Sequence, residues 1–392
     1  MEEGRSLSLR LFSDVSPGVS DPYLARAVML AERGRGFTAP NPLVGCVIVA
    51  DGRIVGEGFH PRAGEPHAEV FALREAGADA RGADVYVTLE PCNHHGKTPP
   101  CTDALIAACV ARVVIGMRDP NPGSAHGATR LREAGIQVDF APDPQPFAAQ
   151  NEGWLKRIAV GIPFVTAKIA LSLDGHGAFQ AGTRAAITGS SGAQVTRMLR
   201  SASDAVMVSA ATVVADDPAL TVRDSEGNRA VRQPLRVVLV RETLPPPSAA
   251  VFTDGLAETK LVVTGTGSHN LGATYAGTEV VHAEGPELVD ALRVLGDLGV
   301  DEVLIEPGPR LFTALWEAGV LDQLVTVTAA GCAGAVAPPL FSGESDRIGD
   351  ALVGRMRPHE VGIVSDVSVT AWRPVGQPCE QERGNESSCS QD

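Results

Sequence analysis

The sequence predicts two α/β domains in tandem. The chain has 392 residues, and a prior of roughly 150 residues per domain points to two or three domains. Apolar segments of strand length alternate with helix-length segments, a pattern typical of βαβ units that form a mainly parallel sheet covered by helices. The composition is that of a folded protein, because 44% of the residues are hydrophobic and 20% are charged.

The first series of elements begins at Asp21 and ends near Pro146. Its elements follow from the hydrophobic periodicity and from the turn residues that separate the segments. In chain order we expect a helix at 22–34, strands at 43–52 and 53–60, a helix from 66, a strand at 83–91, a helix at 101–111 and a strand at 112–120. The first domain is therefore expected at 21–147.

The second series begins at Phe164 and is rich in β-branched residues, which favour strands. In chain order we expect a strand at 164–175, a helix at 191–202, strands at 204–214, 234–241, 260–265 and 278–283, and a strand-helix pair at 301–321. The second domain is expected at 162–374. The ends, 1–20 and 375–392, are expected to be flexible, the second because it is polar and lacks periodicity.

Charge and hydropathy restrict the partners and the compartment. The formal net charge is −14, which repels a phosphate backbone, and no local basic patch compensates for it. We therefore expect no nucleic-acid partner. The first residues lack the apolar region of a signal peptide, and no uninterrupted apolar run reaches about 18 residues. These features predict a cytoplasmic protein without a membrane segment.

The seven cysteines form an odd, scattered set that is unsuited to a disulfide framework in a chain of this length. Cys92 and Cys101 are then candidates for metal binding or catalysis, with a pair of packed thiols as the alternative. Cys46 and Cys109 lie on apolar segments and are expected to be core thiols. No Gly-x-Ser-x-Gly motif supports a nucleophile of the Ser-His-Asp or Cys-His type.

His67, Cys92 and Cys101 are residue types that bind zinc, and a catalytic zinc keeps three protein ligands and leaves the fourth position to water. Two thiolates and an imidazole also cancel the charge of the ion. Two prolines precede Cys101 at an expected helix start, where free amides lower the pKa of a thiol. Pro66 likewise precedes His67, so the metal would lie beyond the ends of two helices.

Glu69 is the expected acid–base residue. Residues two apart on a regular helix do not face each other, so His67 and Glu69 share a site only beyond the helix end. Glu69 would take a proton from water and deliver it to a substrate nitrogen and the leaving amine. His-x-Glu followed by Pro-Cys and a second Cys is the pattern of zinc-dependent nucleobase deaminases, although the cysteines at 92 and 101 are more widely spaced than in that pattern. His94 and His95 remain open as ligands, as substrate contacts or as solvated side chains.

The segments APNPLVGCVIV, GEPHAEVFAL, YVTLEPCNHHGKTPPCTDALI and RDPNP closely resemble the deaminase half of the bifunctional riboflavin-biosynthesis deaminase/reductase family. The segments PFVTAKIALSLDG, LRSASDAVMVSAATVVADDPALTVR and GPRLFTALWEAGVLDQL are similar to its reductase half. The resemblance covers about 21–374. It implies a cytidine-deaminase-like α/β domain followed by a dihydrofolate-reductase-like α/β domain.

The resemblance also implies two reactions. The first removes the 2-amino group of 2,5-diamino-6-(5-phosphoribosylamino)pyrimidin-4-one at zinc, and the second reduces the ribosyl group to ribityl with NADPH. It implies His67, Cys92 and Cys101 as ligands and Glu69 as proton shuttle. Family members commonly associate, so a homo-oligomer is expected.

The second domain is harder to interpret from its residues alone. It lacks a Gly-x-Gly-x-x-Gly motif, but EPGPRLFTALW predicts a strand, a tight turn and a helix start, which suits a pyrophosphate. ATVVADDPALTVR is expected to be a strand that enters an acidic turn, in which Asp216 or Asp217 could simply cap backbone amides. Arg200 and Arg223 offer the fork geometry that binds phosphate, with two solvated arginines as the alternative.

The resemblance assigns two groups of residues in this domain. Those implied around the substrate are Arg200, Leu220, Arg223 and Glu306. Those implied around NADPH are Ala170, Thr212, Asp216, Gly308 and Pro309. Lys168, on the opening strand, is a further candidate for this site.

The departures from the family pattern also fall in the second domain. Arg184-Ala185-Ala186 replaces a usual Ser-Gln-Trp, and Pro307 lies beside the turn. They leave open a deaminase with an inactive reductase-like domain. A deaminase of a related pyrimidine is a separate alternative, which shares the zinc chemistry but not the substrate.

Overall fold

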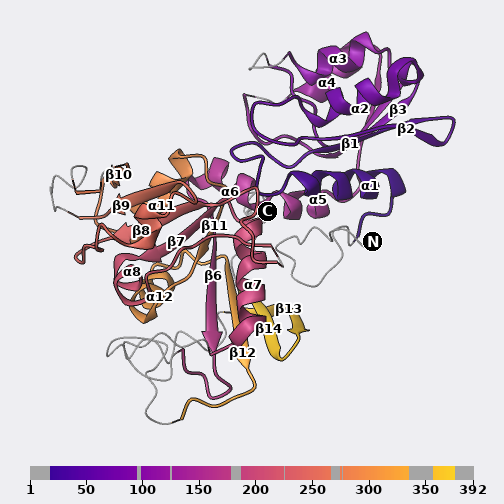
Figure 1. Ribbon diagram of the computed structural model, residues 1–392. Coiled ribbons are helices and arrows are strands. Elements are labelled where there is room, and N and C mark those ends of the chain that lie inside the picture. The colour runs from indigo at the N-terminus through magenta and orange to yellow at the C-terminus, as the bar shows by residue number, and fades with distance from the viewer. Residues whose placement is uncertain are drawn as a thin grey trace, which may run out of the picture.

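Two lobes, each built on one sheet, form the structure of the chain, which is a computed structural model (Figure 1). The residues that it describes are 18–94, 99–123, 126–177, 187–224, 226–265, 274–275, 277–334 and 356–375. The expected domain ranges, 21–147 and 162–374, enclose the two sheets. Most of the two ends that we expect to be flexible lies outside the described residues.

The first lobe has a five-stranded sheet in the order β2-β1-β3-β4-β5. Its strands are β1 (Gly45–Ala50), β2 (Arg53–Phe59), β3 (Asp84–Leu89), β4 (Arg112–Met117) and β5 (Gln137–Phe140). Its helices are α1 (Pro22–Ala31), η1 (Glu32–Gly34), α2 (Ala68–Ala76), η2 (Gly77–Ala80), α3 (Cys101–Ala107), α4 (Gly127–Glu133) and α5 (Gln145–Gln150). Apolar side chains of α2, α3 and α4 cover one face, and those of α1 and α5 cover the other.

The first sheet is less parallel than predicted. β3, β4 and β5 run parallel, whereas β1 is antiparallel to both β2 and β3. β1 and β2 are antiparallel because the tight turn at Asp51 and Gly52 joins them; both residues have positive φ (49° and 73°), which is the geometry that a two-residue hairpin requires. A Cβ on Gly45 would lie 1.9 Å from a carbonyl oxygen of α1, so this glycine permits α1 to approach the sheet.

The second lobe has a nine-stranded sheet in the order β10-β9-β8-β7-β11-β6-β12-β14-β13. Its strands are β6 (Phe164–Leu171), β7 (Ala205–Ser209), β8 (Leu235–Val240), β9 (Thr259–Val263), β10 (Glu279–His282), β11 (Glu302–Ile305), β12 (Gln323–Ala329), β13 (Met356–Val364) and β14 (Val367–Pro374). Its helices are α7 (Gly189–Ala202), α8 (Ala210–Asp216), α9 (Ala250–Thr253), α11 (Leu288–Asp297) and α12 (Pro309–Glu317), and α6 (Glu152–Val160) connects the two lobes. The strands from β10 to β12 are parallel, and β14 and β13 continue the sheet antiparallel.

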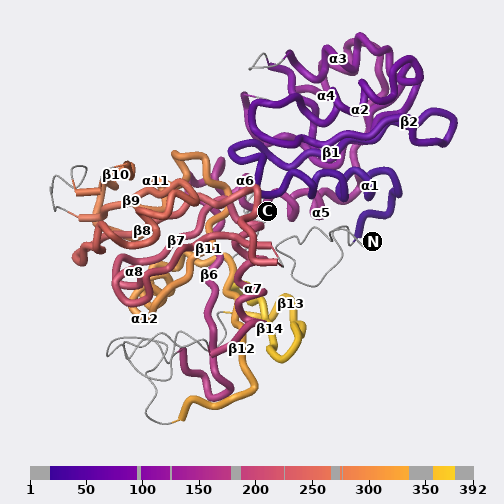
Figure 2. The backbone as a smooth tube through the Cα atoms, in the orientation of Figure 1, coloured from indigo at the N-terminus to yellow at the C-terminus, as the bar shows by residue number. Residues whose placement is uncertain are grey.

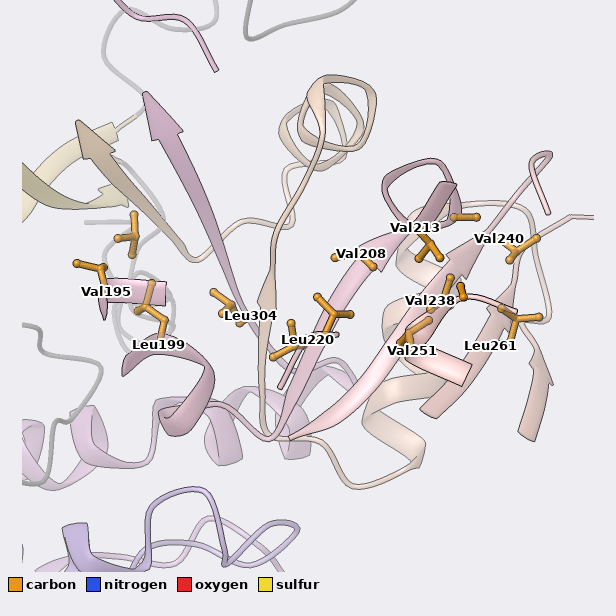
Figure 3. Close-up of a cluster of buried hydrophobic side chains, with 14 of the residues drawn as sticks. Val195, Leu199, Val208, Val213, Leu220, Val238, Val240, Val251, Leu261 and Leu304 are labelled. Atoms are coloured by element: carbon orange, nitrogen blue, oxygen red, sulfur yellow. The ribbon is translucent and has the colours of Figure 1, made fainter. Parts of the chain in front are cut away.

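Two apolar clusters cover the faces of the second sheet. Side chains of α7, α8 and α9 pack on one face in a cluster that extends from Val195 past Val208 to Leu261 (Figure 3). Side chains of α11 and α12 pack on the other face. Strands buried on both faces explain the continuous apolar runs in the sequence of this half.

The prediction of one strand is wrong in its second half. The segment 204–214 was expected to be a strand throughout, but β7 ends at Ser209 and α8 follows at once. The side chain of Ser209 accepts a hydrogen bond from the amide of Thr212 and caps the helix. Local capping therefore overrides the strand preference of Val213 and Val214.

Helices α5 and α6 carry the chain from the first lobe into the second (Figure 2). Trp154 of α6 is buried in the core of the first lobe. The next turn forms ion pairs with the second lobe, from Lys156 to Asp322 and from Arg157 to Asp301, each over 2.5 Å. No helix in the described part of the chain combines the length and apolar character that a membrane crossing requires.

Arg236 is the largest fully buried side chain among the described residues of the second lobe, and all three of its guanidinium nitrogens donate hydrogen bonds. Its guanidinium lies 2.8 Å from a carboxylate oxygen of Asp254 and also donates to the hydroxyl of Thr259 and to carbonyl oxygens. Its side chain is 1% exposed. Removing one partner of such a buried pair leaves an uncompensated charge.

We predict that Arg236→Met lowers the free energy of unfolding of the second lobe by about 3 kcal/mol, because the half-buried carboxylate of Asp254 and the acceptors around the guanidinium then lose their partner. Arg293→Met is the matched control, since Arg293 pairs with Asp290 at the surface and is 59% exposed. The control should cost less than about 0.5 kcal/mol. Urea unfolding of each variant gives both values, and equal losses would contradict the prediction.

Candidate active sites

Three candidate metal ligands converge at one edge of the first sheet. Cys92 follows the end of β3, His67 caps the start of α2, and Cys101 is the first residue of α3. Their donor atoms lie within 4.8 Å of one another. The Nδ1 atom of His67 is 3.2 Å from the sulfur of Cys101 and 3.5 Å from that of Cys92. Within the described ranges, no other group of His, Cys, Asp and Glu side chains has this geometry.

Prolines place two of the ligands at helix starts. Pro66 precedes His67, whose backbone is extended (φ −76°, ψ 167°) and lies just outside α2, and Pro100 is the N-cap of α3. The ligands therefore meet beyond the helix ends. The amide of Cys101 donates to the sulfur of Cys92 over 3.3 Å, and a free amide at a helix N-terminus stabilises negative charge there.

The protonation of the two thiols fits a cation site. A hydrogen bond with the Cys101 thiol is the largest cause that lowers the pKa of Cys92 to about 4, and the same contact raises the pKa of Cys101. A hydrogen bond with Cys92 raises the pKa of the His67 imidazole. Two sulfurs and one imidazole are the donor set of a catalytic zinc site, and an arriving cation must displace the Cys101 proton.

Glu69, in the first turn of α2, lies beside the three ligands. Its side chain is 2% exposed, and its Oε2 atom is buried without a hydrogen-bond partner. Burial raises the pKa of its carboxyl. A carboxyl with a raised pKa and a free oxygen is suited to exchanging a proton with a ligand in the site.

A cavity of about 370 Å³ opens beside this group. The lining side chains that sequence reasoning did not single out include Asn41, His60, Asp119, Asn121, Trp154 and Arg157. Asn41 and Asp119 belong to the segments APNP and RDPNP, so the family resemblance was the available signal for them. Burial raises the pKa of Asp119 to about 6. No sequence signal marks the residues of α6.

His60 is hydrogen-bonded at both ring nitrogens. Its Nδ1 lies 3.1 Å from the carbonyl oxygen of Pro66, and its Nε2 lies 3.1 Å from the side-chain amide nitrogen of Asn41. Burial lowers the pKa of His60, which favours a neutral ring that donates from Nδ1 and accepts at Nε2. The ring is edge-on to that of His67, with centroids 5.3 Å apart. His60 thus connects the Asn41 segment to a metal ligand.

The structure confirms only some of the expectations for the other histidines and cysteines. His94 is exposed and lines the cavity, outside the group of three ligands, and His95 lies outside the described residues. Cys46 is buried in the first-lobe core, as expected. The expectation for Cys109 is wrong: it is exposed, because the chain leaves α3 there through a left-handed turn (φ 56°).

The residues implied around NADPH lie near one edge of the second sheet. Ala170 is near the end of β6, Thr212 and Asp216 are in α8 after β7, and Gly308 and Pro309 follow β11. β7, β11 and β6 are adjacent and parallel, so their carboxyl ends meet at one edge. A Cβ on Gly308 would lie 3.8 Å from the hydroxyl of Thr212, which places the starts of α8 and α12 side by side.

The residues implied around the substrate fall into two groups. Arg200 pairs with Glu306 through two hydrogen bonds of 2.5 and 2.9 Å. Lys168 lies close enough for Glu306 to raise its pKa, but burial outweighs this and lowers it overall. Leu220 has a left-handed backbone (φ 52°), and its side chain is in the core. Arg223 is exposed and donates to the carbonyl of Gly227.

Of the two departures from the family pattern, one lies among the described residues. Pro307 is half-buried between Glu306 and Gly308. Arg184-Ala185-Ala186 lies outside the described residues.

We predict that zinc binds more tightly as pH rises from 6 to 8, by about tenfold per pH unit for each proton displaced. Cys92 is already ionised in this range, whereas Cys101 and His67 must lose protons. Competition with a chelator at several pH values measures the slope, and an affinity independent of pH would contradict the prediction. Cys101→Ser should abolish tight binding, whereas Cys109→Ser, at the exposed cysteine, should leave it unchanged.

Comparisons with known proteins cover both lobes. Residues 19–117 match the cytidine and deoxycytidylate deaminase zinc-binding region, and residues 163–359 match the RibD C-terminal domain. The chain is 45% identical to riboflavin biosynthesis protein RibD of Escherichia coli over 78% of this chain and 86% of that protein. It is 39% identical to RibD of Aquifex aeolicus over 84% of this chain and 89% of that protein.

Solved structures agree with this result. RibD of Acinetobacter baumannii superimposes with a TM-score of 0.81 at 37% identity, over 90% of this chain and 98% of that one. A diaminohydroxyphosphoribosylaminopyrimidine deaminase/5-amino-6-(5-phosphoribosylamino)uracil reductase of Thermotoga maritima does so with a TM-score of 0.78 at 32% identity, over the same shares. The chain therefore belongs to the RibD family of bifunctional enzymes of riboflavin biosynthesis, with a zinc-type deaminase lobe followed by a reductase lobe.

Proposed function

We propose that this chain deaminates 2,5-diamino-6-(5-phosphoribosylamino)pyrimidin-4-one in its first lobe and reduces the ribosyl group of the product to ribityl with NADPH in its second. The observation that carries the proposal is the convergence of His67, Cys92 and Cys101 beside Glu69 in one cavity. The substrate is supported by the similarity to the Thermotoga maritima enzyme, which is named for these compounds.

In the deaminase lobe, His67, Cys92 and Cys101 would hold zinc. Zinc supplies an activated water, since the pKa of water falls to about 7 on the metal. Glu69 takes one proton of the attacking water on its free oxygen and passes it to the ring nitrogen. It then takes the second proton from the hydroxyl group formed on the ring carbon and passes it to the amine, which leaves as ammonia. Asn41 and Asp119 line the cavity, where their polar groups can bind the amino and carbonyl edges of a pyrimidine.

In the reductase lobe, the proposed NADPH contacts are Ala170, Thr212, Asp216, Gly308 and Pro309. Two helix starts lie side by side there, and helix N-termini suit a pyrophosphate. The proposed substrate contacts are Arg200, Leu220, Arg223 and Glu306. Glu306 orients Arg200, and Arg223 offers a guanidinium for the substrate phosphate.

The domain ranges, the partners, the compartment and the assembly are also proposals. We take residues 21–147 and 162–374 as the two functional domains. The net charge of −14 supports a small-molecule substrate and no nucleic-acid partner. We further propose a cytoplasmic homo-oligomer.

We predict that Glu69→Gln lowers the rate of deamination by about 10²–10⁴, because the amide cannot transfer the proton. Zinc content and reduction of the deaminated pyrimidine with NADPH should stay at the wild-type level. Mass-resolved turnover assays and metal analysis measure these quantities. Glu75→Gln is the matched control, at an exposed position near the end of the same helix.

A Glu69→Gln variant that retained deamination would refute the assigned role. If the wild type itself leaves this pyrimidine unchanged but carries zinc, the deaminase acts on a related pyrimidine. If it deaminates but neither binds nor oxidises NADPH, the reductase lobe is inactive.

We predict that Arg223→Met raises the KM of the reduction by about ten- to hundredfold through loss of a charge-assisted phosphate contact, and leaves deamination unchanged. Arg229→Met is the control, because Arg229 pairs with Arg223 in an isolated β-bridge and is also exposed. Steady-state kinetics on the deaminated pyrimidine give both KM values. Equal effects of the two substitutions would indicate general electrostatics instead of a specific contact.

A further inference from the structure

Helix α6 lies between the two family matches, which cover 19–117 and 163–359. It is nevertheless part of the deaminase cavity, because Trp154, Arg157 and Ile158 line that cavity together with the metal ligands. The cavity wall thus includes a segment that neither match contains.

Arg157 connects this wall to the reductase lobe. Its Nε atom lies 2.5 Å from a carboxylate oxygen of Asp301, the residue before β11. Its Nη2 atom donates to the carbonyl oxygen of Pro40 over 2.7 Å. The side chains of Arg157 and Asp301 are 17% and 9% exposed, so solvent screens this ion pair less than a surface pair.

The contacts continue from Pro40 to a metal ligand. Asn41 follows Pro40 and contacts Nε2 of His60. Nδ1 of His60 contacts the carbonyl of Pro66, the residue before His67. A continuous series of polar contacts and short chain segments therefore joins Asp301 of the reductase lobe to the metal site of the deaminase lobe.

Both lobes hold the start of α6 closely. Asn151 exchanges two hydrogen bonds with the backbone of Leu43, of 2.7 and 3.1 Å. A Cβ on Gly153 would lie 2.7 Å from the carbonyl oxygen of Asp301, so α6 approaches the reductase lobe at backbone distance. A displacement of α6 would therefore move the cavity wall and the segment around Asn41 together.

We propose that Arg157, held by Asp301, is a positioning residue of the deaminase site. It orients the Pro40–Asn41 segment and, through it, His60, so that the reductase lobe, through Asp301, fixes one wall of the substrate cavity of the deaminase lobe. The proposal rests on the proposed function for the identity of the substrate. It implies that a residue of the second lobe affects the first reaction without affecting the second.

The test compares Arg157→Met and Asp301→Asn with Lys156→Met in the full-length, zinc-loaded protein. Lys156 is the matched control, because it is adjacent on α6 and also pairs with the reductase lobe, at Asp322, but does not line the cavity. For the first two variants we expect deamination kcat/KM to fall about tenfold, with a raised KM. Reduction of the deaminated pyrimidine should change less than about twofold for all three.

Two further variants separate positioning from general stability. The double variant Arg157→Met/Asp301→Asn should be no worse than Arg157→Met, because the two residues act as one unit. Arg157→Lys should recover part of the loss, because lysine keeps the charge but not the fork that reaches both partners. A merely structural role would lower the active fraction and leave KM unchanged.

Hydrogen exchange gives a readout that needs no turnover. Amides of residues 39–46 should exchange faster in Arg157→Met and Asp301→Asn than in the wild type, and at the wild-type rate in Lys156→Met. Equal effects of Lys156→Met and Arg157→Met, an unchanged KM, or a parallel loss of reduction would overturn the proposal. A wild type that does not deaminate the pyrimidine would refute the proposed substrate instead, and the exchange rates would still decide the role of Arg157.

Discussion

The deaminase lobe depends on the meeting of a strand end and two helix starts. β3 leads to Cys92 near the point where α2 and α3 begin. Pro66 precedes His67, the N-cap of α2, and Pro100 is the N-cap before Cys101, the first residue of α3, so both ligands lie at helix starts. The amide of Cys101 then stabilises the sulfur of Cys92. Donor atoms, low thiol pKa and a buried carboxyl arise from one local arrangement of the backbone.

In the reductase lobe, too, the candidate site residues gather where strands end and helices begin, here at the edge of a larger sheet. β7, β11 and β6 are parallel neighbours, so the segments that follow them gather at one edge. Helices α8 and α12 start at that edge, and helix N-termini suit an anionic cofactor in the absence of a glycine-rich dinucleotide motif. The Arg200–Glu306 pair is placed at the same edge because Glu306 directly follows β11.

Buried ion pairs also join the two lobes at their junction. Arg35 bridges Glu32 of the first lobe and Glu302 of the second, with contacts of 2.7 and 2.9 Å. Charges buried this deeply are costly to separate, because each would lose its partner without regaining full hydration. Together with the ion pairs of α6, this contact holds the two lobes against each other.

The sequence alone determined the tandem α/β architecture and the group His67, Cys92, Cys101 and Glu69, because short motifs with prolines at helix starts dictate their own geometry. Only the tertiary structure decided the rest of the cavity: Asn41, His60, Asp119 and Arg157 come from four separate segments, and no local pattern encodes their meeting. The antiparallel hairpin at Asp51, helix α8 and the exposed Cys109 likewise depended on turn and cap geometry, which competes with hydrophobic periodicity and can overrule it.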